Sequence, residues 1–146
     1  MKKIFKFLIF LLPWFLSSLF MKNVNFYKSL NLPFFAPPPI LFAIVWPILY
    51  LLIAISIYKI SKIGFSEEYK YFLIANYIFN QSFTFLFFNL KSIILGTLSS
   101  ILSLITAIFL FLETKKSNKK TSYLLIPYLI WLIFASILSI SILFLN

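Results

Sequence analysis

Five stretches of this chain are long enough and apolar enough to cross a lipid bilayer: 4–20, 40–58, 71–88, 92–112 and 123–145. A membrane-crossing helix needs about 20 mostly apolar residues, and it satisfies its backbone hydrogen bonds internally. The alternating pattern of a membrane β-barrel is absent from these stretches. The sequence therefore predicts an all-α membrane protein, a bundle of five transmembrane helices forming a single domain over residues 1–146, in contact with the lipid bilayer.

The charged residues of the chain exclude several classes of function. Only 11% of residues are charged, against roughly 25% in soluble domains. Arg, Asp, His and Cys are absent, so the sequence offers no ordinary metal site, no His base and no Ser-His-Asp triad. It also lacks a glycine-rich phosphate loop. We expect no catalytic residue and no metal ligand, and an enzyme is the less favoured class.

The connections between the stretches have distinct patterns. Segment 21–39 is the longest, and its three consecutive prolines, Pro37 to Pro39, can begin a helix but cannot lie inside one. Segment 89–91 is a tight turn, which predicts that the third and fourth helices are antiparallel neighbours. The start of the chain, Met1-Lys2-Lys3 before an apolar run, has the pattern of a signal peptide, but no clear cleavage site follows, so we expect an uncleaved helix.

The distribution of lysines predicts the orientation in the membrane. With five spans, one side carries ten lysines: Lys2, Lys3, Lys6, Lys59, Lys62, Lys70, Lys115, Lys116, Lys119 and Lys120. The other side carries three: Lys22, Lys28 and Lys91. Because cytoplasmic loops are enriched in basic residues, we expect a cytoplasmic N-terminus and an external C-terminus, in a bacterial inner membrane. The net charge of +10 has this explanation, so no nucleic-acid partner is expected.

Three helix faces combine residues that have both a structural and a functional interpretation. Asn76, Asn80 and Phe83 share one face of the third stretch, either as a polar stripe facing a ligand or as interhelical hydrogen-bonding groups. The spacing alone favours hydrogen bonding. Trp46 and Tyr50 share a face of the second stretch. Trp131, Ala135 and Leu138 share a face of the fifth stretch. Each of these two faces has two interpretations: it lines a cavity, or it only packs against neighbouring helices.

Small residues form a stripe on the fourth stretch: Gly96, Ser100, Ser103 and Ala107. Small residues allow close approach of another helix. The stripe is equally compatible with packing inside the monomer and with a homodimer interface.

Three motifs, in order along the chain, resemble the TspO/MBR family. Residues 26–38 read Phe-Tyr-Lys-Ser-Leu-Asn-Leu-Pro-Phe-Phe-Ala-Pro-Pro, and Trp46 and Leu49-Tyr50 follow. Residues 80–88 read Asn-Gln-Ser-Phe-Thr-Phe-Leu-Phe-Phe, similar to the family's Asn-x-x-Trp-x-x-x-Phe-Phe. Residues 127–135 read Pro-Tyr-Leu-Ile-Trp-Leu-Ile-Phe-Ala, similar to the signature of the family's fifth helix.

The resemblance implies a five-helix bundle with a ligand cavity under a long, proline-rich first loop. It implies a membrane receptor, carrier or sensor that needs no obligatory cofactor and binds tetrapyrroles such as protoporphyrin IX or heme. Transferred residue by residue, it assigns the cavity to Tyr27, Pro37, Trp46, Tyr50, Asn76, Asn80, Phe83, Trp131, Phe134, Ala135 and Leu138. Lys22 or Lys28, near the loop, would attract the carboxylates of the porphyrin.

Two alternative functions remain open under this resemblance. The first is light-dependent degradation of porphyrin, in which cavity tryptophans take part. Phe26, Phe35 and Phe83 stand where the family usually has Trp, and Phe cannot replace Trp in radical chemistry. The second is a small transporter of another hydrophobic solute. Segment 139–146 lacks the Tyr and the basic residue of the sterol-recognition pattern, so sterol binding is not expected.

Overall fold

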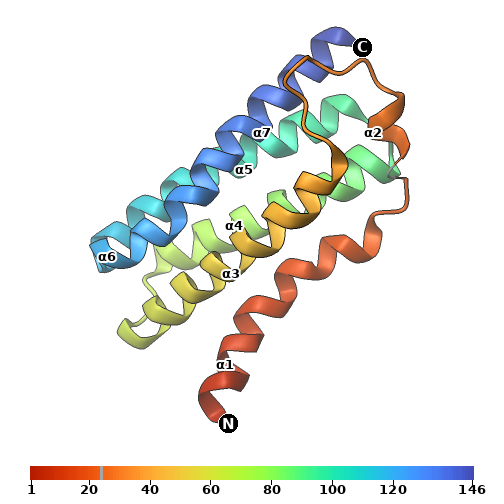
Figure 1. Cartoon of the computed structure of the whole chain (residues 1–146). Helices are drawn as coiled ribbons and strands as arrows, with labels where there is room; N and C mark the ends of the chain where they lie inside the picture. The colour runs from red at the N-terminus through yellow and green to blue at the C-terminus, as the bar shows by residue number, and fades with distance from the viewer. Residues whose placement is uncertain (24) are drawn as a thin grey trace.

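The computed structural model describes residues 1–23 and 25–146, and every regular element in this part of the chain is helical. Figure 1 shows long helices packed side by side, with the N-terminus at one end of the bundle and the C-terminus at the other. The first helix consists of α1 (Lys2–Leu11) and a 3₁₀ continuation, η1 (Leu12–Phe20). A short helix, α2 (Asn25–Ser29), lies in the connection that follows.

The remaining helices form the centre of the bundle. They are α3 (Pro39–Ile63), α4 (Glu67–Thr84) with a π-helical extension η2 (Phe85–Asn89), α5 (Ile93–Ser117), and finally α6 (Lys119–Ser122), η3 (Tyr123–Leu125) and α7 (Ile126–Leu145). The second half of the first helix is 3₁₀ rather than α-helical, and Pro13 lies in the first turn of this 3₁₀ segment. The helix α4, the third long helix of the chain, ends in the π-helical turn η2.

In the part of the chain that the structure describes, three helical segments are long and apolar enough to cross a membrane. They are Pro39–Ser61, Ile93–Ser117 and Lys119–Leu145, with mean hydropathies of 2.7, 2.3 and 2.5. The chain is therefore a multi-pass membrane protein. Neither the first helix nor α4 is among these three segments. The α-helical part of the first helix has only 10 residues, and three of the first four residues of α4 are charged: Glu67, Glu68 and Lys70.

Local sequence signals explain where the central helices begin and end. The helix α3 begins at Pro39, directly after the extended Pro38, because proline lacks the N–H that an N-terminal turn leaves unpaired anyway. It ends before Gly64, whose φ of +112° lies where side chains with a Cβ are strained. Ser66 then caps α4, since its hydroxyl accepts a hydrogen bond from the N–H of Tyr69 at 3.1 Å.

Uncharged polar side chains lie inside the bundle beside its apolar and aromatic core, and large apolar side chains also cover the outside. Asn76, Ser103 and Thr114 are at most 1% exposed, whereas Ile74 and Ile78 of α4 are more than half exposed. Lipid is as apolar as these side chains, so hydrophobic burial does not drive the helices together. Packing and interhelical hydrogen bonds must hold the bundle instead.

The turn after η2 places α4 and α5 side by side, as its length predicts. Lys91 has a φ of +52° there, and the N–H of Ser92 donates to the carbonyl of Leu86 at 3.1 Å. The small-residue stripe of α5 is buried inside the monomer: Ser100 shares a hydrogen bond of 3.2 Å with Ser136 of α7, and Ala107 is 1% exposed. The structure thus supports the packing interpretation of this stripe.

Gly96 of α5 allows a close approach of Phe87 of η2. A Cβ at this position would lie 2.7 Å from Cδ2 and 2.9 Å from Cβ of Phe87. An alanine in a helix is normally about 1 kcal/mol more favourable than glycine. We predict the opposite sign here: Gly96→Ala lowers the free energy of unfolding by about 1–3 kcal/mol, the usual cost of overpacking. Reversible denaturation in mixed detergent micelles measures it.

The control for this prediction is the double variant Gly96→Ala with Phe87→Leu. Leucine removes the ring atom at 2.7 Å and keeps only the Cβ contact, so adding Phe87→Leu should cost less in the Gly96→Ala background than in the parent protein. Equal costs in the two backgrounds would show that the Phe87 ring does not set the spacing of these helices.

Candidate functional site

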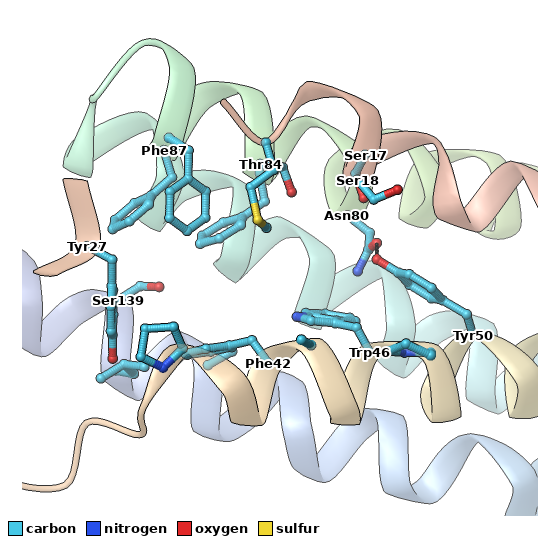
Figure 2. Close-up of a pocket in the computed structure, with 18 of the residues that line it drawn as sticks. Ser17, Ser18, Tyr27, Phe42, Trp46, Tyr50, Asn80, Thr84, Phe87 and Ser139 are labelled. Carbon is cyan, nitrogen blue, oxygen red and sulfur yellow. Dashed lines mark hydrogen bonds between the residues drawn. The ribbon is translucent and has the colours of Figure 1, made fainter. Parts of the chain in front are cut away.

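A cavity of about 410 Å³ lies inside the bundle under the first connection. Its lining residues come from η1, α2, α3, α4, η2 and α7: Phe15, Ser17, Ser18, Met21, Tyr27, Pro39, Phe42, Ala43, Trp46, Pro47, Tyr50, Asn80, Phe83, Thr84, Phe87, Phe88, Ala135, Leu138, Ser139 and Ile142. Figure 2 shows Tyr27 and Ser139 at one end of the cavity and Tyr50 and Asn80 at the other. None of these described lining residues is charged.

The structure places most of the residues expected from the sequence in this lining, but not all. Seven of them line the cavity: Tyr27, Trp46, Tyr50, Asn80, Phe83, Ala135 and Leu138. The other four, Pro37, Asn76, Trp131 and Phe134, do not contribute to the lining. Each of these four residues contacts either a lining residue or a residue that packs behind the lining.

Aromatic rings of α3 form one wall. The rings of Trp46 and Tyr50 are tilted by 31° with centroids 5.4 Å apart, as their spacing of four residues on one helix face requires. Trp131 packs behind Trp46 in an edge-to-face contact with centroids 6.3 Å apart. Its indole nitrogen is buried and has no hydrogen-bond partner among the described residues. Trp131 therefore supports the wall from behind.

Phenylalanines of α4 and η2 form the opposite wall (Figure 2). The rings of Phe83 and Phe87 are stacked, with centroids 5.3 Å apart and planes within 10°. Phe88 packs edge-on against Phe87 at 5.0 Å. A π-helical turn adds a residue to the helix turn, and such turns are frequent at functional sites. Here the turn η2 lets the consecutive Phe87 and Phe88 both contribute to the lining.

Hydrogen bonds around Asn80 form the polar end of the cavity. Its Oδ1 accepts from the hydroxyl of Tyr50 at 3.4 Å, and its Nδ2 donates to the Tyr128 hydroxyl at 3.2 Å. The Tyr128 hydroxyl donates in turn to Oδ1 of Asn76 at 2.9 Å. Nδ2 of Asn76 donates to the Ser103 carbonyl at 2.8 Å. Asn76 thus links α4 to α5 and α7, whereas Asn80 both links helices and faces the cavity.

Gln81 holds η1 against α4. Its Oε1 accepts from the backbone N–H of Ser17 at 2.8 Å, and its Nε2 donates to the carbonyl of Trp14 and to Oδ1 of Asn80, both at 3.1 Å. The hydroxyl of Tyr77 donates to the carbonyl of Pro13 at 2.9 Å. These side chains give backbone groups of η1 hydrogen-bond partners on α4.

The first connection closes the end of the cavity near Tyr27. The hydroxyl of Tyr27 donates to the carbonyl of Pro37 at 3.0 Å, which places Pro37 behind Tyr27. Burial raises the pKa of the Tyr27 phenol above 10.0, so the hydroxyl remains protonated and keeps this bond at neutral pH. Phe35 packs edge-on against Phe134 of α7 at 6.3 Å. Phe134 therefore anchors the connection.

The same connection is also held at the end of α7. The N–H of Asn31 donates to Oδ1 of Asn146 at 2.9 Å, and Nδ2 of Asn146 donates to the Asn31 carbonyl at 3.0 Å. This reciprocal pair joins the middle of the loop to the last turn of the bundle. Together with Tyr27 and Phe35, it fixes the described part of the loop over the cavity.

Sequence reasoning missed the residues that η1 contributes to the lining, above all Ser17 and Ser18. The signal available for them was a pair of hydroxyls in an otherwise apolar stretch. Helical spacing could also have added three residues to the faces already identified: Phe42 lies four residues before Trp46, and Ser139 and Ile142 lie four and seven residues after Ala135.

Comparisons with known proteins match almost the whole chain. A sequence model described as the TspO/MBR family matches residues 5–145. The chain is 36% identical over 125 residues to the tryptophan-rich protein TspO of Bacillus cereus, covering 84% of this chain and 82% of that one. It is 35% identical over 127 residues to the uncharacterized membrane protein YtaB of Bacillus subtilis, covering 85% and 82%. It is 36% identical over 124 residues to the tryptophan-rich protein TspO of Archaeoglobus fulgidus, covering 84% and 80%.

We predict that Gln81→Leu loosens η1 without unfolding the bundle. Leucine removes the side-chain partner of the N–H of Ser17 and of the carbonyl of Trp14, at a cost of about 0.5–1.5 kcal/mol for each hydrogen bond lost. Amide hydrogen exchange, followed by mass spectrometry, should speed up in segment 12–20 and stay unchanged in α5. The matched control is Ile78→Ala, a lipid-facing change on the same helix. If segment 12–20 exchanges at the parent rate in Gln81→Leu, these bonds do not hold η1.

Proposed function

Because the chain belongs to the TspO/MBR family, we propose that it is a membrane receptor or carrier that binds a tetrapyrrole, such as protoporphyrin IX or heme, in the cavity between its helices. The observation that supports this most strongly is the cavity itself, with aromatic walls and one polar end. Its volume of about 410 Å³ lies within the range of roughly 300–1,000 Å³ that is usual for small-molecule sites.

The chemistry of the lining suits a flat aromatic ligand. A porphyrin is a planar aromatic ring system with two carboxylates on one edge. The Trp46 and Tyr50 rings on one side and the stacked Phe83 and Phe87 rings on the other offer π-faces and ring edges to such a plate. The amide of Asn80 can exchange one of its present partners for a polar atom of the ligand.

The residues expected from the sequence divide into two groups under this proposal. Those in the lining would contact the ligand: Tyr27, Trp46, Tyr50, Asn80, Phe83, Ala135 and Leu138. The remaining four would act indirectly, because Trp131 supports Trp46, Asn76 supports Tyr128, and Pro37 and Phe134 hold the first connection.

We further propose that all five long helices cross the membrane. The first helix has 10 residues in α1 and 9 in η1, which together span about 33 Å at rises of 1.5 and 2.0 Å per residue. The segment from Tyr71 to the end of η2 contains no charged residue. The first helix and the segment from Tyr71 to the end of η2 are therefore both long enough to cross the hydrocarbon, which is about 30 Å thick.

The lysines support a cytoplasmic N-terminus under this proposal. The start of α1, the α3–α4 connection and α6 lie at one end of the bundle, opposite α2 and the C-terminus (Figure 1). The first end carries ten lysines and the second carries three. An excess of basic residues on one side marks the cytoplasmic face.

We predict that Trp46→Ala and Asn80→Ala each weaken the binding of protoporphyrin IX by about 2- to 13-fold, the loss expected for about 0.5–1.5 kcal/mol of ring stacking or hydrogen bonding. Trp131→Ala should have a smaller effect, because Trp131 lies behind the wall. The measurement is titration of purified protein in detergent, followed by porphyrin absorbance. Ile78→Ala, which faces lipid, is the control. Parent-like affinity in all three variants would mean that the ligand binds elsewhere.

Lys22 and Lys28 generate a separate prediction about the carboxylates of the ligand. Lys22 directly follows the lining residue Met21, Lys28 follows the lining residue Tyr27, and both lysines are exposed. Surface charge attraction is screened by salt. The double variant Lys22→Gln/Lys28→Gln should therefore bind protoporphyrin IX more weakly than the parent at low salt and nearly as well at high salt. Lys91→Gln, at the same end of the bundle, is the control. An unchanged affinity at low salt would refute the role of these lysines.

A further inference from the structure

The cavity is open on one side, between η1 and α3. Four of its lining residues are exposed at the surface of the bundle: Ser18 and Met21 at the end of the first helix, and Ala43 and Pro47 on α3. In Figure 2, Ser18 lies on η1 across the cavity from Phe42 and Trp46 of α3. These exposed lining residues belong to two helices on opposite sides of the cavity, so they form the two edges of a side opening.

The side opening faces the hydrocarbon of the bilayer. Pro47 is eight residues after the start of α3, which places it about 12 Å along the helix axis. The residues beside the opening are large and apolar: Ile44 and Ile48 are each 54% exposed on α3, and Leu19 is 72% exposed on η1. Such side chains belong in lipid rather than in water.

The packing of the first helix explains why the opening exists. The α1 part packs against α3, where the ring centroids of Phe7 and Tyr58 lie 6.2 Å apart, whereas η1 packs mainly against α4. On α4, Gln81 and Tyr77 bind the backbone of η1 directly. The first helix therefore stays close to α3 at one end of the bundle and leaves it at the other, where the cavity lies.

The end of the cavity under the first connection is closed more firmly. The loop is held there by the hydrogen bond of Tyr27 to Pro37, the contact of Phe35 with Phe134, and the reciprocal pair of Asn31 and Asn146. A ligand passing through that end would have to break these contacts. The side opening requires no such rearrangement of the described residues.

From these observations we propose that the ligand enters and leaves the cavity laterally, from the hydrocarbon phase of the bilayer, through the opening between η1 and α3. This inference rests on the proposed function, because it concerns the access of the cavity ligand. It defines the ligand class further: a planar aromatic molecule that partitions into lipid. Ser18, Met21, Ala43 and Pro47 then control the rate of exchange, which is a different property from affinity.

The test blocks the opening after the ligand has bound. The chain contains no cysteine, so Ala43→Cys provides a single reactive site at the edge of the opening. The protein in phosphatidylcholine vesicles is loaded with protoporphyrin IX, divided, and treated or not treated with a bulky apolar maleimide. Release into excess protein-free vesicles is then followed by porphyrin fluorescence. We expect the treated sample to release the ligand at least about tenfold more slowly, because the adduct fills the opening through which the ligand leaves and so limits its release.

The matched control is Ile44→Cys, the next residue on α3, which is exposed but does not line the cavity. Its treated and untreated samples should release at the same rate within about twofold. The inference is overturned if treatment leaves release from Ala43→Cys unchanged or faster, if it slows release equally in both variants, or if position 43 fails to react. A failure of the proposed function is distinguishable, because the unsubstituted protein would then load no protoporphyrin IX at all.

Discussion

Hydrogen bonds from the side chains of α4 are the interaction on which the rest of the structure depends. Lipid provides no hydrophobic force between helices, and each interhelical hydrogen bond contributes about 0.6 kcal/mol on average, up to about 1.7. Asn76 binds α5 and α7, Asn80 binds α3 and α7, and Gln81 binds the first helix. Three residues within six consecutive positions of α4 therefore bind every other long helix. The buried end of the cavity is made of the same groups, so the stability of the bundle and the shape of its site cannot be separated.

The helices were accessible to sequence reasoning because their signals are local. Apolar runs of about 20 residues, the prolines before α3 and the short turn before α5 each act within one segment. The 3₁₀ conformation of η1 and the π-helical turn η2 were not predicted. Their backbone groups are completed by other segments: Gln81 pairs the backbone of η1, and the N–H of Ser92 reaches back to Leu86 in η2. No pattern inside residues 12–20 or 85–89 contains that information.

The site shows what helical spacing can and cannot provide. Spacing identifies which residues share a face, and it grouped Trp131 with Ala135 and Leu138 correctly as neighbours on α7. It does not give depth along the helix. The cavity lies toward the end of α7, so Ala135 and Leu138 line it while Trp131 lies behind Trp46. In the same way, Asn76 lies one turn nearer the start of α4 than Asn80 and binds Tyr128 and Ser103 instead of facing the cavity. The lateral opening follows from the path of the first helix, which only the three-dimensional arrangement reveals.

An experimental structure of the protein in lipid with protoporphyrin IX bound is the most direct test of the central claim that this cavity is the ligand site. The account predicts the porphyrin ring between the Trp46 wall and the Phe83–Phe87 wall, with a polar atom of the ligand beside the amide of Asn80. It also predicts that Asn76 keeps its bonds to Ser103 and Tyr128. A porphyrin bound on the outer surface of the helices, with the cavity unchanged and without ligand density, would contradict the account.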